Sequence, residues 1–268
     1  MPQNILQKSE RPKARKSRFA EVWKRFRKSN LAMFGLIVIL LIIVMASFAS
    51  VICNYENDAI AQHYDARFLS PSWEHPFGTD DYGRDIFARV LFGTRVSLVV
   101  GISSTALACI IACFLGSIVA YYGGKVDTFL MRILDVFMGI PTLLLAIAIA
   151  ASLGAGIRNL ILALVISQIP GFTRIVRSAV FNITDMEYVE AAKAYGCSPL
   201  YIIVKHILPN AMGTIIVQAT MSVAAQILNT AALSFLGLGQ QAPDPELGSI
   251  LSDAKEYMRY SMWGVLFP

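Results

Sequence analysis

Long apolar runs constrain this chain more than any other feature of its sequence. A helix needs about 20 apolar residues to cross a hydrocarbon layer of about 30 Å, and several runs reach that length. Hydrophobic residues make up 56% of the 268 residues and charged residues only 15%, whereas soluble domains average about a quarter charged. The chain is therefore predicted to be an all-α, polytopic transmembrane helix bundle with five full spans: Leu31–Ile52, Val96–Tyr122, Ile133–Leu153, Leu160–Val180 and Ala211–Leu236.

The positive charges indicate how the chain is threaded through the membrane. Ten of the Lys and Arg residues precede Leu31, and such residues concentrate on the cytoplasmic flanks of spans. Residues 1–30 are therefore predicted to form a basic cytoplasmic N-terminal segment. Alternation of the spans then places residues 53–95 and 237–257 outside the cell and residues 181–210 inside. This clustering of charge also makes nucleic acid an unattractive partner despite the net charge of +5.

A cleaved signal peptide is the alternative reading of the N-terminus. Small residues follow the first apolar run in "MASFAS", as they do at signal-peptide cleavage sites. The basic region and the apolar core are both longer than those of signal peptides. Residues 31–52 are therefore interpreted as a first transmembrane helix that stays in the protein.

The cysteines and the acidic residues do not predict a disulfide framework or a metal site. The predicted topology places the four cysteines within spans or on different sides of the membrane. Cys109 and Cys113 lie one helical turn apart without a His or carboxylate nearby in the sequence, so we interpret them as packing residues. The spacing of His75 and the aspartates at 80, 81 and 85 matches no known metal-binding loop, which favours a solvated, capped turn.

The external segment 53–95 is predicted to end in an amphipathic helix that lies on the membrane surface. An apolar face would carry residues 86, 87, 90 and 91, and a polar face would carry Arg84, Asp85 and Arg89. Residues 96–268 would then form the permease core, whose second span places small residues at intervals of four. Such a groove lets another helix approach closely; it consists of Ser104, Ala108, Ala112, Gly116 and Ala120.

Prolines and polar side chains interrupt the later spans. Pro141 and Pro170 predict kinks, because each removes a backbone hydrogen bond from its helix. Asp135 is expected to pair with Arg132 on the same helix. The few polar groups within the spans either line a hydrophilic pathway or hydrogen-bond between helices, and they are Gln168, Gln218, Gln226 and Asn229. A chain of acidic residues or histidines that would relay protons is lacking, which counts against a self-powered transporter.

One polar stretch, residues 184–210, interrupts the apolar sequence between the fourth and fifth spans. Thr184 and Glu187 have the spacing of a capping box, and Gly196 is placed to end the helix in a left-handed conformation. Ser198 and Pro199 then restart a helix as N-cap and first helical residue. The sequence therefore predicts a helical hairpin that returns to the membrane through Leu208-Pro209.

This hairpin is suited to docking on another protein. Ala191 and Ala192 are small enough for a partner surface to approach closely, and Glu190 offers a carboxylate at that contact. An ordinary inter-helix loop is the alternative, although such a loop does not need two capped helices and a bend.

The hairpin resembles a known motif. "EAAKAYG" followed by "HILP" is similar to the EAA motif of permease subunits of bacterial binding-protein-dependent ABC importers. "HILPN" resembles the dipeptide, oligopeptide and nickel branch, C-type subunit, as do "FGTDDYGRDIFARVLFGTRVSL", "TRIVRSAVFNITDMEYVEAAKAYG" and "LSFLGLGQQAPDPELGSIL". The resemblance extends over nearly all of residues 77–268.

The resemblance implies a type I importer permease in the bacterial cytoplasmic (inner) membrane, with its N-terminus in the cytoplasm. Expected partners are a second, similar permease, two cytoplasmic ATPase subunits and an external substrate-binding protein. The chain lacks a P-loop, so it is expected to be no enzyme and to bind no cofactor, with ATP and Mg at the ATPase subunits. The resemblance implies that the coupling residues are Glu190, Ala191, Ala192 and Gly196, followed by Leu208 and Pro209.

The resemblance leaves the cargo open. Di- or oligopeptides moved by alternating access are favoured, and nickel or a metal chelate is the alternative. A membrane scaffold that docks a different cytoplasmic partner is an alternative of another class, and an ion channel is weaker because no span carries a repeated polar face.

The sequence departs from the branch at two places. Leu247 stands where the branch usually has Trp, and a minor packing change is expected there. The family ends in a sixth span, which would begin at "MWGVLFP", so we expect the last helix to be cut off or absent.

Overall fold

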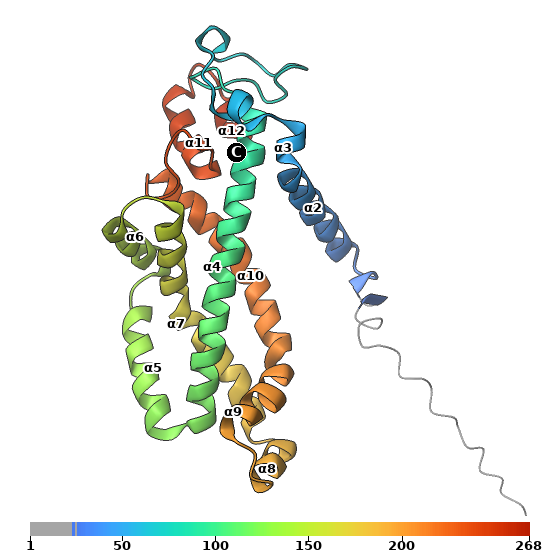
Figure 1. Cartoon of the computed structure of the whole chain (residues 1–268), viewed down its shortest axis with the longest axis vertical. Coiled ribbons are helices and arrows are strands. Elements are labelled where there is room, and N and C mark those ends of the chain that lie inside the picture. The colour runs from blue at the N-terminus through green and yellow to red at the C-terminus, as the bar shows by residue number, and fades with distance from the viewer. Residues whose placement is uncertain (1–22, 25) are drawn as a thin grey trace, which may run out of the picture. The chain divides into compact units, whose positions relative to one another are not determined.

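The computed structural model describes residues 23, 24 and 26–268 and divides the chain into two units, Met1–Met45 and Ala46–Pro268 (Figure 1). The described residues are helical or irregular and contain no extended strand. This agrees with the predicted all-α class. Most of the described part of the first unit is α2, which spans Asn30–Ser47.

The second unit contains the remaining helices. Its α-helices are α3 (Ala49–Ile52), α4 (Ile86–Tyr122), α5 (Gly124–Met138), α6 (Thr142–Leu153), α7 (Ile157–Thr184), α8 (Glu187–Ala194), α9 (Pro199–Ile202), α10 (Leu208–Phe235), α11 (Leu247–Ala254) and α12 (Trp263–Leu266). Short π or 3-10 turns occur at Tyr55–Ile60, Tyr64–Ala66, Ile203–Ile207 and Lys255–Tyr257.

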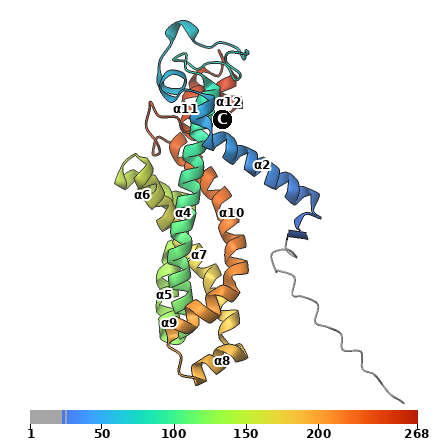
Figure 2. The same cartoon turned by 45° about the vertical axis from the view of Figure 1, so that its right-hand side comes forward.

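Helices α4, α7 and α10 pack together and form the centre of the second unit (Figures 1 and 2). The small-residue groove predicted on α4 is confirmed, because all five of its residues are buried. At Gly116 the backbone of α7 is so close that an added Cβ would lie 2.9 Å from Val176 Cβ. Close helix contact of this kind provides dispersion energy where lipid offers no hydrophobic driving force.

Two groups of buried apolar side chains stabilise this unit. The hairpin cluster joins the parts of α4, α7 and α10 near α8 and α9 to the hairpin itself, and includes Phe172, Val176, Ile202 and Ile207. The α6 cluster joins α6 to other parts of the same three helices, and includes Val100, Ala146, Leu164 and Leu233. The far end of the unit carries a lobe of residues 53–85 and 237–268, here called the distal lobe (Figure 1).

Four helical segments of the described chain are long and apolar enough to cross a membrane. They are α2, α4, α7 and the continuous stretch Pro199–Phe235. The predicted third span, Ile133–Leu153, differs from expectation, because it is divided between α5 and α6, which meet at an angle of 82°. The break lies at Gly139–Pro141, where Pro141 precedes the first residue of α6. By contrast, Pro170 lies inside the continuous helix α7.

The separate surface helix predicted at the end of segment 53–95 is wrong. Residue 86 begins α4, which continues without interruption to Tyr122. Asp85 caps this helix, since its Oδ1 accepts a 2.8 Å hydrogen bond from the Ala88 amide. The supposed polar face is not solvated either, because Arg84 and Arg89 are only 3% and 2% exposed.

Candidate functional site

The hairpin between α7 and α10 has the predicted bend. Helix α8 ends at Ala194, and Gly196 follows with φ +75°, a left-handed conformation that glycine adopts without a steric penalty. Ser198 Oγ then accepts a hydrogen bond of 3.4 Å from the Tyr201 amide, and Pro199 begins α9. The predicted N-cap and first helical residue of the second helix are therefore confirmed.

The predicted capping box at Thr184 and Glu187 is wrong. Helix α7 continues through Thr184, whose Oγ1 donates a 2.8 Å hydrogen bond back to the Phe181 carbonyl. Met186 occupies the N-cap position of α8 and has no side-chain cap. The physical reason is that the Thr184 hydroxyl bonds to the preceding turn, as threonine does inside helices.

The hairpin is fixed at its base by buried apolar side chains. Val189 of α8 and Ile202 and Ile207 after the bend are fully buried in the hairpin cluster. Lys193 Nζ also lies 5.4 Å from the centre of the Tyr121 ring at the end of α4. The hairpin is therefore packed against the bundle rather than suspended from it.

The predicted coupling residues fall on two sides of the hairpin. Glu190, Ala191 and Gly196 are exposed, whereas Ala192 is buried against the hairpin cluster. Leu208 is half-buried on the same cluster, and Pro209 is exposed in the first turn of α10. Ala192 therefore allows close packing within the hairpin, while the exposed residues are available to a partner.

The hairpin also has an apolar surface that no sequence pattern indicated. Tyr195 is 88% exposed and Leu200 is 67% exposed. Exposed apolar side chains gathered on a short projection are typical of a protein–protein contact. They lie beside Glu190 and Ala191 along the chain and form with them the hairpin surface, defined here as Glu190, Ala191, Tyr195, Leu200 and Tyr201.

The polar residues predicted to lie in the spans form no network across helices in the described part of the chain. Gln218 donates to Ser222 Oγ at 3.3 Å, and Asn229 donates to Gln226 Oε1 at 3.3 Å, all on α10. On α7, Gln168 Oε1 is buried without a hydrogen-bond partner among the described residues. The four residues of α10 follow one another at helical spacing and so share one side of that helix.

Two ion pairs between α5 and α7 were missed by the sequence analysis. Arg177 binds Asp127 through two hydrogen bonds, 2.5 Å from Nε to Oδ1 and 2.6 Å from its second nitrogen to Oδ2. Arg174 pairs with Asp135, so the predicted pair of Asp135 with Arg132 is wrong. The partners are 50 and 39 residues apart in the chain, which explains why local spacing did not show them.

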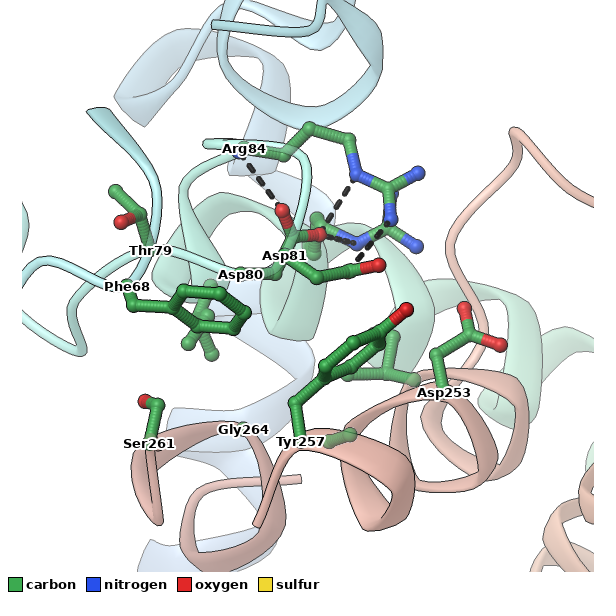
Figure 3. A pocket seen from close by; sticks show the side chains of 13 residues that line it. Phe68, Thr79, Asp80, Asp81, Arg84, Asp253, Tyr257, Ser261 and Gly264 are labelled. Carbon is green, nitrogen blue, oxygen red and sulfur yellow. Dashed lines mark hydrogen bonds and ion pairs between the residues drawn. The ribbon is translucent and has the colours of Figure 1, made fainter. Parts of the chain in front are cut away.

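The distal lobe contains a buried group of charges instead of the predicted solvated turn. Asp80 Oδ2 lies 2.7 Å from Arg84 Nε and 3.6 Å from Arg89 Nε. Asp81, Asp253 and Tyr257 line a cavity of about 20 Å³ beside them (Figure 3), which is room for one water-sized group. Burial is the main cause that raises the pKa of the Asp81 carboxyl above its ordinary 3.8.

Glu246 forms a second buried polar centre in this lobe. It is fully buried, and its carboxylate accepts hydrogen bonds from Ser97 Oγ at 3.0 Å and from the Gly248 amide at 2.8 Å. Loss of water raises the pKa of this carboxyl despite those bonds. Nowhere in the described part of the chain do three or more His, Cys, Asp or Glu side chains gather as a metal site would require.

The fold thus defines a multi-pass helical membrane protein with a packed polar hairpin at one end. Residues 112–267 match the family described as the inner membrane component of binding-protein-dependent transport systems, and residues 17–71 match the N-terminal transmembrane domain of oligopeptide transport permease C. The chain therefore belongs to the family of binding-protein-dependent transport system permeases. It is a membrane permease of a bacterial ABC importer, not an enzyme.

Individual relatives agree with this placement. The chain is 44% identical to the dipeptide transport system permease protein DppC of Alkalihalophilus pseudofirmus, over 94% of this chain and 82% of the relative. It is 40% identical to the glutathione transport system permease protein GsiD of Escherichia coli O6:K15:H31, over 92% and 82%. Its fold is similar to an inward-facing structure of the MetNI methionine ABC transporter, with a TM-score of 0.57, 20% identity and coverage of 67% and 86%.

Proposed function

We propose that this chain is the C-type permease subunit of an ATP-driven importer of di- or oligopeptides. Two relatives named for dipeptide and glutathione transport, both peptide cargoes, support this choice of cargo over nickel. The proposed assembly contains a second permease, two ATPase subunits that bind ATP and Mg, and an external substrate-binding protein.

The observation that carries the proposal is the construction of the hairpin. Its inner side is fixed in the hairpin cluster through Val189, Ile202 and Ile207, whereas the hairpin surface is free. A force applied to that surface by a closing ATPase pair would move the attached parts of α7 and α10 as one packed body, because close-packed interiors transmit displacement. Docking on an ATPase subunit is therefore the role we assign to Glu190 and Ala191, with Gly196 forming the bend.

We further propose that the hairpin and residues 1–30 lie in the cytoplasm. Ten Lys and Arg residues precede Leu31, and positive flanks remain on the cytoplasmic side. The distal lobe, including residues 53–85, would then face the external binding protein.

For the translocation pathway we propose one side of α10 together with part of α7. Gln218 and Asn229 share that side of α10, and Gln168 has a buried oxygen that lacks a partner among the described residues. Polar groups within spans must face protein or water. Side chains of this kind would hydrogen-bond a peptide backbone during passage.

A charge reversal on the hairpin tests the coupling role. Glu190→Lys is compared with Glu256→Lys, which makes the same change at an exposed position of the distal lobe. Membrane insertion, recovery of the ATPase subunits with the purified chain and uptake of radiolabelled alanyl-alanine are measured. We expect Glu190→Lys to insert normally but to lose ATPase recovery and uptake, while Glu256→Lys keeps ATPase recovery.

Either of two results would contradict the proposal. Normal ATPase recovery and uptake with Glu190→Lys would remove the coupling role from this part of the hairpin. Uptake of radioactive nickel but not of alanyl-alanine by the unmodified complex would overturn the peptide assignment.

A further inference from the structure

Helix α5 is attached to the second unit in an unusual way. None of its residues is buried, and none belongs to the hairpin cluster or to the α6 cluster. Apolar side chains of α5 are instead exposed, with Phe129 67% and Val136 73% exposed. Half-buried Leu130, Met131 and Leu134 are the most enclosed apolar side chains of α5, so apolar packing accounts for only part of its position beside α7 (Figure 1).

Two ion pairs provide the side-chain hydrogen bonds between α5 and α7 in the described part of the chain. Asp127 and Asp135 are eight residues apart on α5, and Arg174 and Arg177 are three residues apart on α7, so each set lies on one side of its helix. The Asp127–Arg177 pair is bidentate, with distances of 2.5 and 2.6 Å. Planar, bidentate pairs of this type fix orientation as well as distance.

These pairs link α5 to the half of α7 that carries the hairpin. On α7 the arginines follow Pro170 and lie among Phe172, Val176 and Val180, which belong to the hairpin cluster. At its other end α5 meets the 82° break and then α6, which packs in the α6 cluster. Helix α5 thus connects the hairpin-bearing half of α7 to the break at Gly139–Pro141 and, beyond it, to α6.

We propose that Asp127–Arg177 and Asp135–Arg174 are positioning contacts that make α5 move with the hairpin-bearing half of α7. The source of that movement, an ATPase docked on the hairpin, rests on the function proposed above. Through these contacts a displacement of the hairpin reaches the break at Gly139–Pro141 and changes the position of α5 relative to α6.

Ion pairs suit this task because of the surroundings of the two helices. Arg174 lies within the stretch of α7 that is apolar enough to cross a membrane, and charges in such a place are costly unless they are paired or hydrated. The Arg177 and Asp127 side chains are 30% and 23% exposed, so removal of one partner leaves a partly buried charge unpaired, which is more damaging than removal of the pair. A charge exchange between the helices should therefore restore what a single reversal destroys.

A distance measurement tests the proposal directly. Spin labels are attached to Val136→Cys on α5 and Asn182→Cys on the hairpin-bearing half of α7, both exposed positions, in the assembled transporter with the four native cysteines replaced by serine. Pulsed dipolar spectroscopy then compares the nucleotide-free and the ATP-trapped complex. We expect one narrow distance in both states for the unmodified pairs, and a broad or nucleotide-dependent distance when Arg174→Gln and Arg177→Gln are introduced together. A nucleotide-dependent distance with both ion pairs intact would overturn the proposal.

Transport measurements supply the second test. Arg177→Asp should reduce uptake of alanyl-alanine by about tenfold or more while the ATPase subunits still hydrolyse ATP, and Asp127→Arg in the same chain should recover most of the uptake. Arg132→Asp is the matched control, because Arg132 is exposed on α5 and forms no ion pair among the described residues. Unchanged uptake with Arg177→Asp would overturn the proposal, as would an equal loss in the exchanged chain that still assembles with its ATPase.

The outcomes separate this inference from the function on which it rests. If Glu190→Lys leaves ATPase recovery unchanged, the coupling role of the hairpin fails, whatever the spin labels report. If Glu190→Lys behaves as expected and the labelled distance still changes with nucleotide, only the role of the ion pairs fails.

Discussion

Arg84 Nε donates a 2.7 Å hydrogen bond to Asp80 Oδ2 inside the distal lobe, where the two side chains are only 4% and 14% exposed. Asp80 Oδ1 also accepts from the Tyr82 and Arg84 amides, both at 2.9 Å. The neighbouring Asp81 side chain is more buried, at 7% exposure, but its closest cation is Arg84 at 3.9 Å. The buried charge of Asp80 is therefore compensated by hydrogen bonds and an ion pair, whereas the buried charge of Asp81 is poorly compensated.

This difference predicts unequal effects of two matched substitutions. Asp80→Asn removes the charge that Arg84 and Arg89 share, so we expect a loss of about 2 kcal/mol or more in the stability of the purified protein. Asp81→Asn removes a buried charge without a good partner and should leave stability unchanged or raise it. Thermal unfolding in detergent at neutral pH measures both, and a larger loss for Asp81→Asn would contradict this account.

The pH dependence of stability should also depend on Asp81. Its folded-state pKa is raised mainly by burial, so the unfolded chain gives up this proton at a lower pH than the folded protein does. The contribution of Asp81 to the free energy of unfolding is therefore fully present below its ordinary pKa. That contribution is lost as the pH rises through the raised pKa. In unfolding experiments over the acidic range, Asp81→Asn should remove that part of the pH dependence. An identical pH profile in the variant would show that another group is responsible.

Gly116 and Gly213 form a second matched pair. A Cβ at Gly116 would lie 2.9 Å from Val176 Cβ and 3.0 Å from the Arg177 backbone nitrogen, whereas one at Gly213 would meet no atom within 4 Å. Alanine favours a helix over glycine by about 1 kcal/mol, so Gly213→Ala should be neutral or stabilising. Gly116→Ala should instead lower the unfolding temperature, because α4 and α7 must separate. Equal unfolding temperatures for the two variants would mean that α7 can move away from α4 without loss of stability.

Gly196 gives a test of the bend alone. Its φ of +75° is unfavourable for residues with a Cβ by about 1–2 kcal/mol, and most of all for β-branched ones. Nothing lies within 4 Å of an added Cβ, so backbone strain, not a clash, decides the outcome. Gly196→Val should reduce recovery of the ATPase subunits, and Gly196→Asn should largely retain it because asparagine tolerates this conformation. Equal recovery with both would show that the bend does not need glycine.

Local sequence signals predicted the parts of the structure that depend on neighbouring residues. Gly196 and Ser198 act within one turn of the chain, and the small residues on α4 repeat at helical spacing, so both could be read directly. The break between α5 and α6 could not, because the apolar composition continues across Gly139–Pro141 and hydropathy does not encode the direction taken after a proline.

The charged contacts were missed for a different reason. Arg89 is buried because its side chain donates to the carbonyls of Ala59 and Pro243, which lie 30 and 154 residues away. Arg174 and Arg177 likewise find their partners on another helix. A local pattern shows a charge but not its distant partner, so Arg89 was predicted to be solvated and the ion pairs of α7 were not predicted.

Glu246 provides the last prediction, which separates hydrogen bonding from charge. Its carboxylate joins α11 to α4, since it accepts from the Ser97 hydroxyl and from the Gly248 and Ser249 amides. Glu246→Ala leaves three donors without partners in a fully buried site, and we expect a loss of about 2–4 kcal/mol in unfolding free energy.

Glu246→Gln should retain most of that stability. The amide oxygen can accept from the two backbone groups, and the amide nitrogen can donate to Ser97 Oγ, which is able to accept. Burial already disfavours the charge of Glu246, as its raised pKa indicates, so loss of the charge costs little. Glu256→Ala at an exposed position serves as the control for removal of a glutamate. If Glu246→Gln were as unstable as Glu246→Ala, the negative charge itself would be what joins the distal lobe to α4.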